Sequence, residues 1–330
     1  MKSSNAKISR RNFIRSAAAA TTAGAVFPQI LPRRIVGGAS HTPPSETLNV
    51  VGIGAGMMGM HNMRSAQNAG MNILAVCEVD EIRGKAALQV YPNASLHGDY
   101  RRMLEEEADI DAVIVSTPDH THAMISMAAM ELGKHVYCEK PLAHSLYETR
   151  VMTEAARKYG IASQLGNHGH SFHAIREFRD CIWSGEIGEV REIHVVAAQF
   201  NFSMIEAISQ LSEKHPLPNT LDWDLWLGPA AHRDFHPLYQ GPWRGWRPFG
   251  SGMLGDYVCH VVDPVFWALN LGAPTSVMAE TDGFDLKKHI DTFPAQTKLT
   301  FEFPARDELP PVTLHWHDGK KIDAPELDEI

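Results

Sequence analysis

The chain has 330 residues, of which 44% are hydrophobic and 21% are charged, and this composition predicts a globular protein with two domains of ordinary size. The first 40 residues carry seven basic and no acidic side chains, so the formal net charge of −9 becomes −16 once that segment is removed. Such an acidic chain is a poor partner for nucleic acid or an anionic membrane surface, and a neutral small molecule suits it better.

The basic N-terminal segment predicts an export signal. Residues 9–15, Ser-Arg-Arg-Asn-Phe-Ile-Arg, resemble the twin-arginine signal S-R-R-x-F-L-K, and the stretch at 17–30 behind them is only mildly apolar. That stretch is shorter than the roughly 20 residues that span a bilayer and contains Pro28, which argues against a stable membrane anchor. We expect cleavage near Ala39 and a mature protein that is periplasmic or otherwise exported.

Residues 48–80 predict a nucleotide-binding unit. An apolar, β-branched run at 48–53 leads directly into Gly54, Gly56 and Gly59, spaced as G-x-G-x-x-G, and a helix follows. Gly54 would permit a tight turn, Gly56 would let the backbone approach a pyrophosphate, and Gly59 would let the helix pack against the strand. Met57 and Met58 then lie at the helix N-terminus, where free N–H groups favour an anion.

A carboxylate after the second strand indicates which nucleotide binds. The strand at 72–76 is followed by Glu78, 24 residues after Gly54 and near the roughly 20-residue offset of the acid that binds an adenosine ribose. Glu78 and Asp80 would repel a 2′-phosphate, so NAD is favoured as the cofactor. Arg83 is a nearby positive charge that could accommodate a 2′-phosphate, so NADP is an alternative cofactor.

The alternation of strands and helices continues to residue 165 and predicts a doubly wound parallel sheet of the Rossmann type. We expect helices at 80–90, 100–107, 121–132 and 145–159, strands at 112–116, 134–138 and 161–165, and a turn at 97–99. Ligands of such sheets lie beyond the carboxyl ends of the strands, and polar clusters follow three of the strands, at 117–122, 139–141 and 167–170.

These motifs carry a family resemblance. The glycine turn, the pair Thr117-Pro118 with His122, and the tripeptide Glu-Lys-Pro at 139–141 together resemble the Gfo/Idh/MocA oxidoreductases over about residues 48–320. The resemblance implies an NAD(P) cofactor and a lysine that meets both cofactor and substrate. The residues it assigns to the cofactor site are Thr117, Pro118, His122, Glu139 and Lys140.

The second half predicts an α+β substrate domain. Strand patterns at 189–200, 276–280, 297–303 and 312–316 predict an open, mostly antiparallel sheet. The passage at 223–255 is rich in aromatic residues and glycine, as sugar-binding walls are, although for any single tryptophan a core position is the commoner outcome. The candidate substrate residues are Asn167, His170, Trp243, Arg244 and Trp246.

A helix expected from 252 to about 269 carries the family's second motif. Gly252, Asp256 and His260 match G-x-x-x-D-x-x-x-H. A spacing of four places the last two on one helix face, where the carboxylate could orient the imidazole or share a substrate hydroxyl with it. The resemblance implies a catalytic set of Lys140, Asp256 and His260.

Histidines and cysteines suggest no further chemistry. There are eighteen histidines, but those at 120, 122, 168 and 170 have no carboxylate at ligand spacing, so we expect no metal. The four cysteines fall singly, and Cys77 and Cys138 are expected to be buried thiols at strand ends.

These observations predict a signal peptide at 1–40, an NAD-binding domain at 41–170 and a substrate domain at 171–330. Exported members of the family generally run longer, so we expect the acidic tail at 323–330 to mark a truncated chain that lacks the last sheet strands. The sequence is compatible with a homo-oligomer.

Three functions are consistent with the motifs. The first is an exported oxidoreductase with tightly held NAD(P) that moves a hydride to or from a secondary hydroxyl of a sugar, glycoside or polyol, with Lys140 binding the hydroxyl and His260 accepting its proton. The second is an NAD-dependent glycosidase that oxidises its substrate only transiently. The third is a sugar or nucleotide sensor without enzymatic activity.

Overall fold

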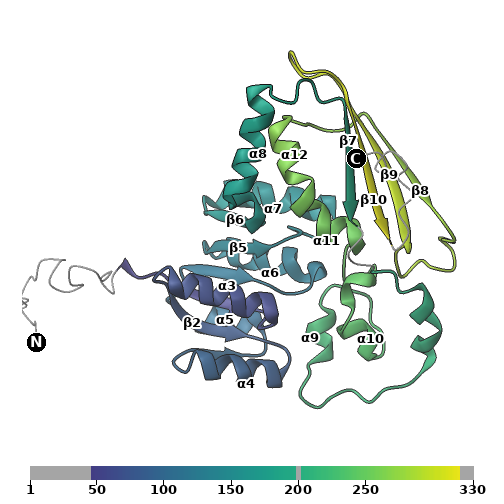
Figure 1. Cartoon of the computed structure of the whole chain (residues 1–330). Coiled ribbons are helices and arrows are strands. Elements are labelled where there is room, and N and C mark those ends of the chain that lie inside the picture. Colours follow the sequence, from purple (N-terminus) through teal and green to yellow (C-terminus); the bar gives the residue numbers. More distant parts are fainter. Residues whose placement is uncertain (1–45, 198–201, 320–330) are drawn as a thin grey trace, which may run out of the picture. The chain divides into compact units, whose positions relative to one another are not determined.

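The computed structural model describes residues 46–197 and 202–319, so the predicted export signal lies outside the described residues. From Leu48 onward the chain forms one unit with two β-sheets (Figure 1). Within the described ranges, the helices are all too short or too polar to cross a membrane.

The first sheet is parallel and has the strand order β3-β2-β1-β4-β5-β6. Its strands are β1 (Asn49–Ile53), β2 (Asn72–Cys77), β3 (Ser95–His97), β4 (Ala112–Val115), β5 (His135–Glu139) and β6 (Ser163–Gly166). The strand order reverses at β1, which pairs with β2 on one side and β4 on the other. This is the predicted Rossmann sheet, and the gap between β1 and β4 is its ligand-binding switch point.

Helices cover both faces of this sheet. They are α3 (Met57–Asn68), α4 (Glu81–Val90), α5 (Tyr100–Glu106), α6 (Asp119–Glu131) and α7 (Leu146–Tyr159). Val50 and Val51 are 1% and 0% exposed although neighbours on a strand point to opposite faces. Val50 packs with Met63 of α3, whereas Val51 belongs to the cluster that contains Met130 of α6. Both faces are therefore core, as the uninterrupted apolar runs predicted.

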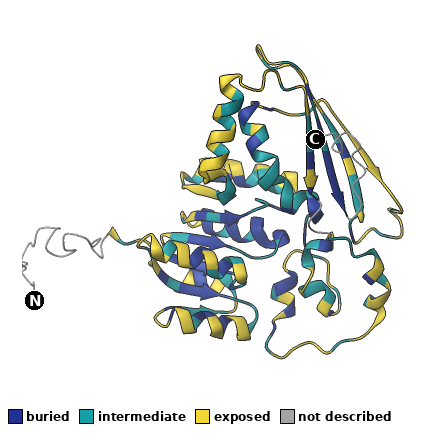
Figure 2. Cartoon of the chain, in the orientation of Figure 1, coloured by how far each residue is buried: buried dark blue, intermediate teal, exposed yellow. Residues whose placement is uncertain are grey.

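The second sheet has the order β7-β10-β9-β8, formed by β7 (Glu192–Ala197), β8 (Ser276–Thr281), β9 (Gln296–Phe303) and β10 (Val312–Gly319). β9 is antiparallel to both β8 and β10, and β10 is parallel to β7, so the sheet is mixed but mostly antiparallel. Figure 2 shows that β10 is largely buried, and Leu314 and Trp316 on it are 2% and 0% exposed.

Three helices cover one face of the second sheet (Figure 1): α8 (His173–Ser184), α11 (Gly252–Val261) and α12 (Asp263–Ala268). The remaining elements are short: η3 (His168–Ser171), η4 (Ile205–Ser212), α9 (Trp223–Leu227), α10 (Pro237–Gln240) and η5 (Trp243–Gly245). One of them, α9, contacts the carboxyl edge of the first sheet, where the His120 ring of α6 is hydrogen-bonded to the carbonyl oxygen of Trp226.

Several expectations need correction. The single helix predicted at 252–269 is two helices, α11 and α12, because Pro264 in the first turn of α12 has no N–H with which to continue α11. The turn predicted at 97–99 begins one residue too early, since His97 closes the three-residue strand β3. Helix α8 was not predicted at all.

Candidate active site

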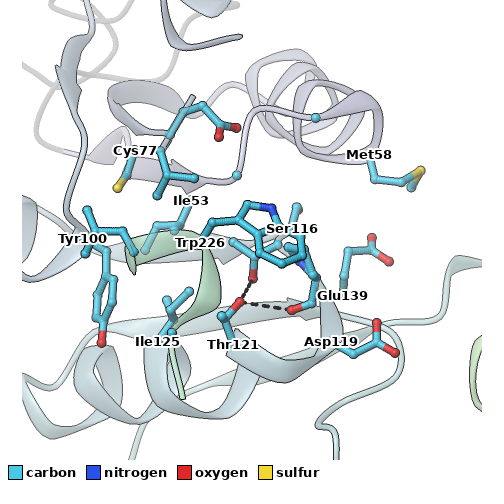
Figure 3. Close-up of a pocket in the computed structure, with 18 of the residues that line it drawn as sticks. Ile53, Met58, Cys77, Tyr100, Ser116, Asp119, Thr121, Ile125, Glu139 and Trp226 are labelled. Carbon is cyan, nitrogen blue, oxygen red and sulfur yellow. Dashed lines mark hydrogen bonds between the residues drawn. The ribbon is translucent and has the colours of Figure 1, made fainter. Parts of the chain in front are cut away.

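A cavity of about 620 Å³ lies at the carboxyl edge of the first sheet, the position expected of a Rossmann ligand site. Figure 3 shows Cys77, Ser116 and Glu139 around it, at the ends of β2, β4 and β5. From the second half of the chain, Trp226 (Figure 3) lines the same cavity. Arg244 and His260 line it too. Both halves of the chain thus form one site.

The glycine turn is built as its spacing predicted. Gly54 has φ +89°, and a Cβ there would lie 2.6 Å from the carbonyl oxygen of Ser116. A Cβ on Gly59 would lie 1.8 Å from the oxygen of Gly54, so only glycine lets α3 pack this closely. Gly56 caps α3 without a side-chain bond and faces the cavity, so the first N–H groups of the helix are available to an anion.

Glu78 lies at the end of β2, where a ribose would bind. One of its oxygens accepts a hydrogen bond from the N–H of Ala55 at 2.7 Å, and the other from Asp80 at 3.1 Å. Burial raises the pKa of Glu78 above its usual range, although the two N–H groups oppose this. The carboxylate lines the cavity next to Asp80 and Arg83. An anion cradle followed by a ribose acceptor fits NAD.

Lys140 is held at its charged end by Asp256. The Lys140 Nζ lies 2.9 Å from Asp256 Oδ1 and 3.0 Å from the Asp256 carbonyl oxygen. Arg244 Nε donates to the same Oδ1 at 2.8 Å. Burial would raise the pKa of Asp256, but the two cations outweigh it and hold the pKa below its usual range. Lys140 and Arg244 line the cavity, whereas Asp256 lies behind them.

The predicted pairing of Asp256 with His260 is therefore corrected. Both residues lie on α11, but the carboxylate binds the two cations instead of orienting the imidazole. His260 lines the cavity itself, and its pKa is lowered, first by burial and then by the Lys140 charge. The imidazole is consequently neutral at pH 7 and able to accept a proton.

His122 does not line the cavity but connects the two loops that do. Its Nδ1 lies 2.8 Å from the carbonyl oxygen of Pro141, and its Nε2 lies 2.8 Å from that of Thr117. Carbonyl oxygens only accept hydrogen bonds, so the imidazolium form satisfies both contacts. Burial by itself lowers the pKa of His122, but Cys138, Asp119 and the Pro141 carbonyl outweigh it and raise the pKa to about 10.

Thr117, Pro118 and Glu139 line the cavity as the motifs indicated, and so do Met57 and Met58. Glu139 Oε1 accepts a hydrogen bond from Asn62 of α3 at 2.9 Å, which fixes the carboxylate between the glycine helix and β5. Asn62 was not singled out by the sequence, because one asparagine inside a helix carries no pattern.

The predicted substrate residues separate into two groups. Trp243 and Arg244 line the cavity, and the guanidinium lies 4.2 Å from the centre of the Trp243 ring. Three others lie outside the lining. Asn167 donates to the carbonyl oxygen of Cys259, and His170 pairs with Asp263 at 2.8 Å. Trp246 is 0% exposed and donates to Leu238, so it is a core residue and not part of a sugar-binding wall.

Asp119 and His168 are among the lining residues that had not been assigned to the site. Asp119, 2% exposed, accepts a hydrogen bond from Ser251, and burial raises its pKa. His168 has its Nε2 3.7 Å from Glu139. Their position directly after strands of the first sheet was the available signal. The other histidines considered as metal ligands lie apart, with His120 bonded to the carbonyl oxygen of Trp226.

Comparison with known proteins identifies the family. The model "Oxidoreductase family, NAD-binding Rossmann fold" matches residues 48–167, and "Oxidoreductase family, C-terminal alpha/beta domain" matches residues 173–307. Both describe Gfo/Idh/MocA proteins, and together they cover well over half of the chain. The chain belongs to the Gfo/Idh/MocA oxidoreductase family.

Curated relatives match about half of the chain. Inositol 2-dehydrogenase of Salmonella typhimurium is 32% identical over 152 residues, which are 45% of this chain and 45% of that protein. The 1,5-anhydro-D-fructose reductase of Ensifer adhaerens is 32% identical over 169 residues, 50% of this chain and 39% of that protein. The matched segment thus spans less than half of the length of each relative.

Solved structures support the fold along most of the chain. A levoglucosan dehydrogenase in complex with NADH and levoglucosan has a TM-score of 0.60 at 22% identity, covering 84% of this chain and 68% of that one. An oxidoreductase domain protein from Kribbella flavida has a TM-score of 0.59 at 26% identity, covering 83% and 67%. The described residues therefore form an NAD-binding Rossmann domain followed by the C-terminal α/β domain of the family.

Two glycines of the turn should respond differently to alanine. Gly56→Ala adds a Cβ with no atom nearer than Arg83 Nη1 at 4.0 Å, so thermal stability should persist while NAD binding weakens about tenfold or more. Gly59→Ala should lower the melting temperature itself, because its Cβ meets Gly54. Calorimetry and NAD titration of both variants test this, and equal effects of the two would contradict it.

The two hydrogen bonds that His122 makes to the carbonyl oxygens of Thr117 and Pro141 predict that stability depends on pH. Because the folded pKa is raised to about 10, the imidazolium contributes fully below the unfolded value of about 6.5, and this contribution disappears as pH rises through the folded pKa. The loss of unfolding free energy in His122→Gln should therefore be larger at about pH 6 than at about pH 9.5. Urea unfolding of the wild type and the variant at both pH values measures this loss. An equal loss at the two pH values would refute the imidazolium form of His122.

Proposed function

We propose that this protein uses NAD to oxidise a secondary hydroxyl of a sugar, glycoside or polyol to a ketone, or to reduce the corresponding ketone to the hydroxyl. The observation that carries the proposal is the convergence of Lys140 and His260 on one cavity that also contains the nucleotide-binding turn. Bound NAD would supply the acceptor or donor of the hydride exchanged with the carbinol carbon. The names of the relatives, inositol 2-dehydrogenase and levoglucosan dehydrogenase among them, support a polyhydroxylated substrate.

The ammonium of Lys140 would bind the reacting oxygen. Two of its three N–H donors are hydrogen-bonded to Asp256, and the third would bind a ligand in the cavity. A hydroxyl oxygen that loses its proton develops negative charge, and a positioned cation stabilises that charge most in a partly buried site. Only 12% of the Lys140 side chain is exposed, so water screens it little.

His260 would receive the proton. A histidine that acts as a base must be unprotonated before the reaction, and the lowered pKa of His260 favours this form. Asp256 would act through Lys140 and Arg244 as a positioning residue. Arg244, stacked on Trp243, would form the wall next to the reacting carbon.

A panel of glycosides, polyols and free sugars, incubated with the protein and NAD and analysed by mass spectrometry, tests the proposal. A ketosugar or keto-polyol product supports it. Release of a free sugar without net oxidation would replace it with the glycosidase scheme, which the same residues would serve. Binding without any product would indicate a sensor.

Lys140→Ala should lower turnover at least about 100-fold, since it removes a positioned cation from the reacting oxygen. NAD affinity should stay within a few-fold, because the glycine turn and Glu78 are untouched. Lys158→Ala, at a lysine of α7 outside the cavity lining, is the matched control. Turnover retained in Lys140→Ala would refute the role given to this lysine.

Export is part of the proposal and rests on the sequence at residues 9–15. Outside the cytoplasm there is no NAD pool, so the cofactor would have to travel inside the folded protein and be released slowly. Replacing Arg10 and Arg11 by lysine should leave the protein in the cytoplasm, as shown by fractionation. Natively purified wild-type protein without bound nucleotide would count against the tightly held cofactor.

A further inference from the structure

The face of the second sheet opposite its helices carries a cluster of histidines. Leu314 and Trp316 of β10 point into the apolar core, so His315 between them points to the other face. In the parallel register with β7, His315 lies beside His194, and Thr313 beside Glu192. The side chains of Glu192, His194 and His315 therefore share one patch, which lies outside the catalytic cavity lining.

The donor atoms of this patch converge. His194 Nε2 lies 3.1 Å from Glu192 Oε1, and His315 Nε2 lies 3.2 Å from the same oxygen. The three atoms all lie within 4.8 Å of one another. Ligand atoms at about 2.0 to 2.2 Å from a tetrahedral zinc ion are separated by about 3.3 to 3.6 Å, so the two nitrogen–oxygen distances are close to those of a coordination sphere.

The surroundings are compatible with a cation at the centre. One carboxylate oxygen faces two imidazole nitrogens, and each nitrogen must carry either a proton or a bond to a cation for the contact to be attractive. His315 Nδ1 lies 3.2 Å from Thr300 Oγ1, a contact that would hold the ring with Nε2 toward Glu192. Lys298 of the adjacent strand β9 is paired with His317, whereas the residue of β9 paired with His315 is the uncharged Thr300.

We propose that Glu192, His194 and His315 bind a divalent transition metal ion of the zinc type. Two imidazoles and a carboxylate are ligands that zinc accepts, and the fourth position would be taken by water because the patch is only partly buried. The ion would connect β7, which pairs only with β10 in the described sheet, to the rest of the sheet. It would thus stabilise the attachment of an edge strand to the sheet, at a place separate from the catalytic site.

Zinc titration of tag-free full-length protein tests the proposal. Wild-type protein should bind zinc at this site, and its melting temperature should rise with zinc concentration, because a ligand of the folded state stabilises it. His194→Ala and His315→Ala should each weaken this binding at least about tenfold. His173→Ala is the matched control, since His173 also contacts one glutamate, Glu177, but has no second imidazole.

A second readout guards against misfolding of the variants. Cobalt bound to the wild-type protein should give the intense visible absorption of four-coordinate nitrogen and oxygen ligation, and Glu192→Gln should weaken it while NAD binding is unchanged. Zinc binding retained in both His194→Ala and His315→Ala would overturn the proposal. So would the absence of zinc binding by the wild-type protein, or a cobalt spectrum like that of the hydrated ion.

Discussion

The ion pair between Lys140 and Asp256 is the interaction on which the site depends. The two residues are 116 positions apart, one directly after β5 and the other on α11, and each side chain is only 12% exposed. Taking both charges out of water is costly, and the cost is offset only when the geometry is good and further hydrogen bonds are made. Arg244 and the Asp256 carbonyl supply them. The pair therefore joins the two halves of the chain where the chemistry is proposed.

The backbone that carries Lys140 is held as firmly as its ammonium. The His122 imidazolium binds the carbonyl oxygen of Pro141 on one side and of Thr117 on the other, so the loops after β4 and β5 cannot separate without breaking two charge-assisted hydrogen bonds. Glu139, just before the lysine, is bonded to Asn62 on the glycine helix. The resemblance implied that His122 lies beside the cofactor; in the structure it is buried outside the cavity lining, where it positions the two loops.

The distribution of charge around the cavity supports alcohol chemistry. Two cations share one carboxylate, and a neutral imidazole lies on the same cavity wall. The hydroxyl proton needs an unprotonated base to receive it, and the oxygen left behind needs a nearby cation. These opposite requirements are met because burial and Lys140 both lower the pKa of His260, while the same Lys140 is held by Asp256.

The sequence by itself determined the first sheet, its switch point and the nucleotide turn, because buried parallel strands are continuous apolar runs and because Gly54 and Gly59 each leave no room for a Cβ. It also indicated the residues that follow the strands, since parallel strands end at one edge. Only the tertiary structure decided which charges pair. Spacing placed Asp256 and His260 on one helix face, but the carboxylate binds a lysine 116 residues away, and Trp246 became core while Trp243 stayed at the cavity. Local periodicity reports which face a side chain takes, whereas its partner across the fold depends on long-range packing that no local pattern contains.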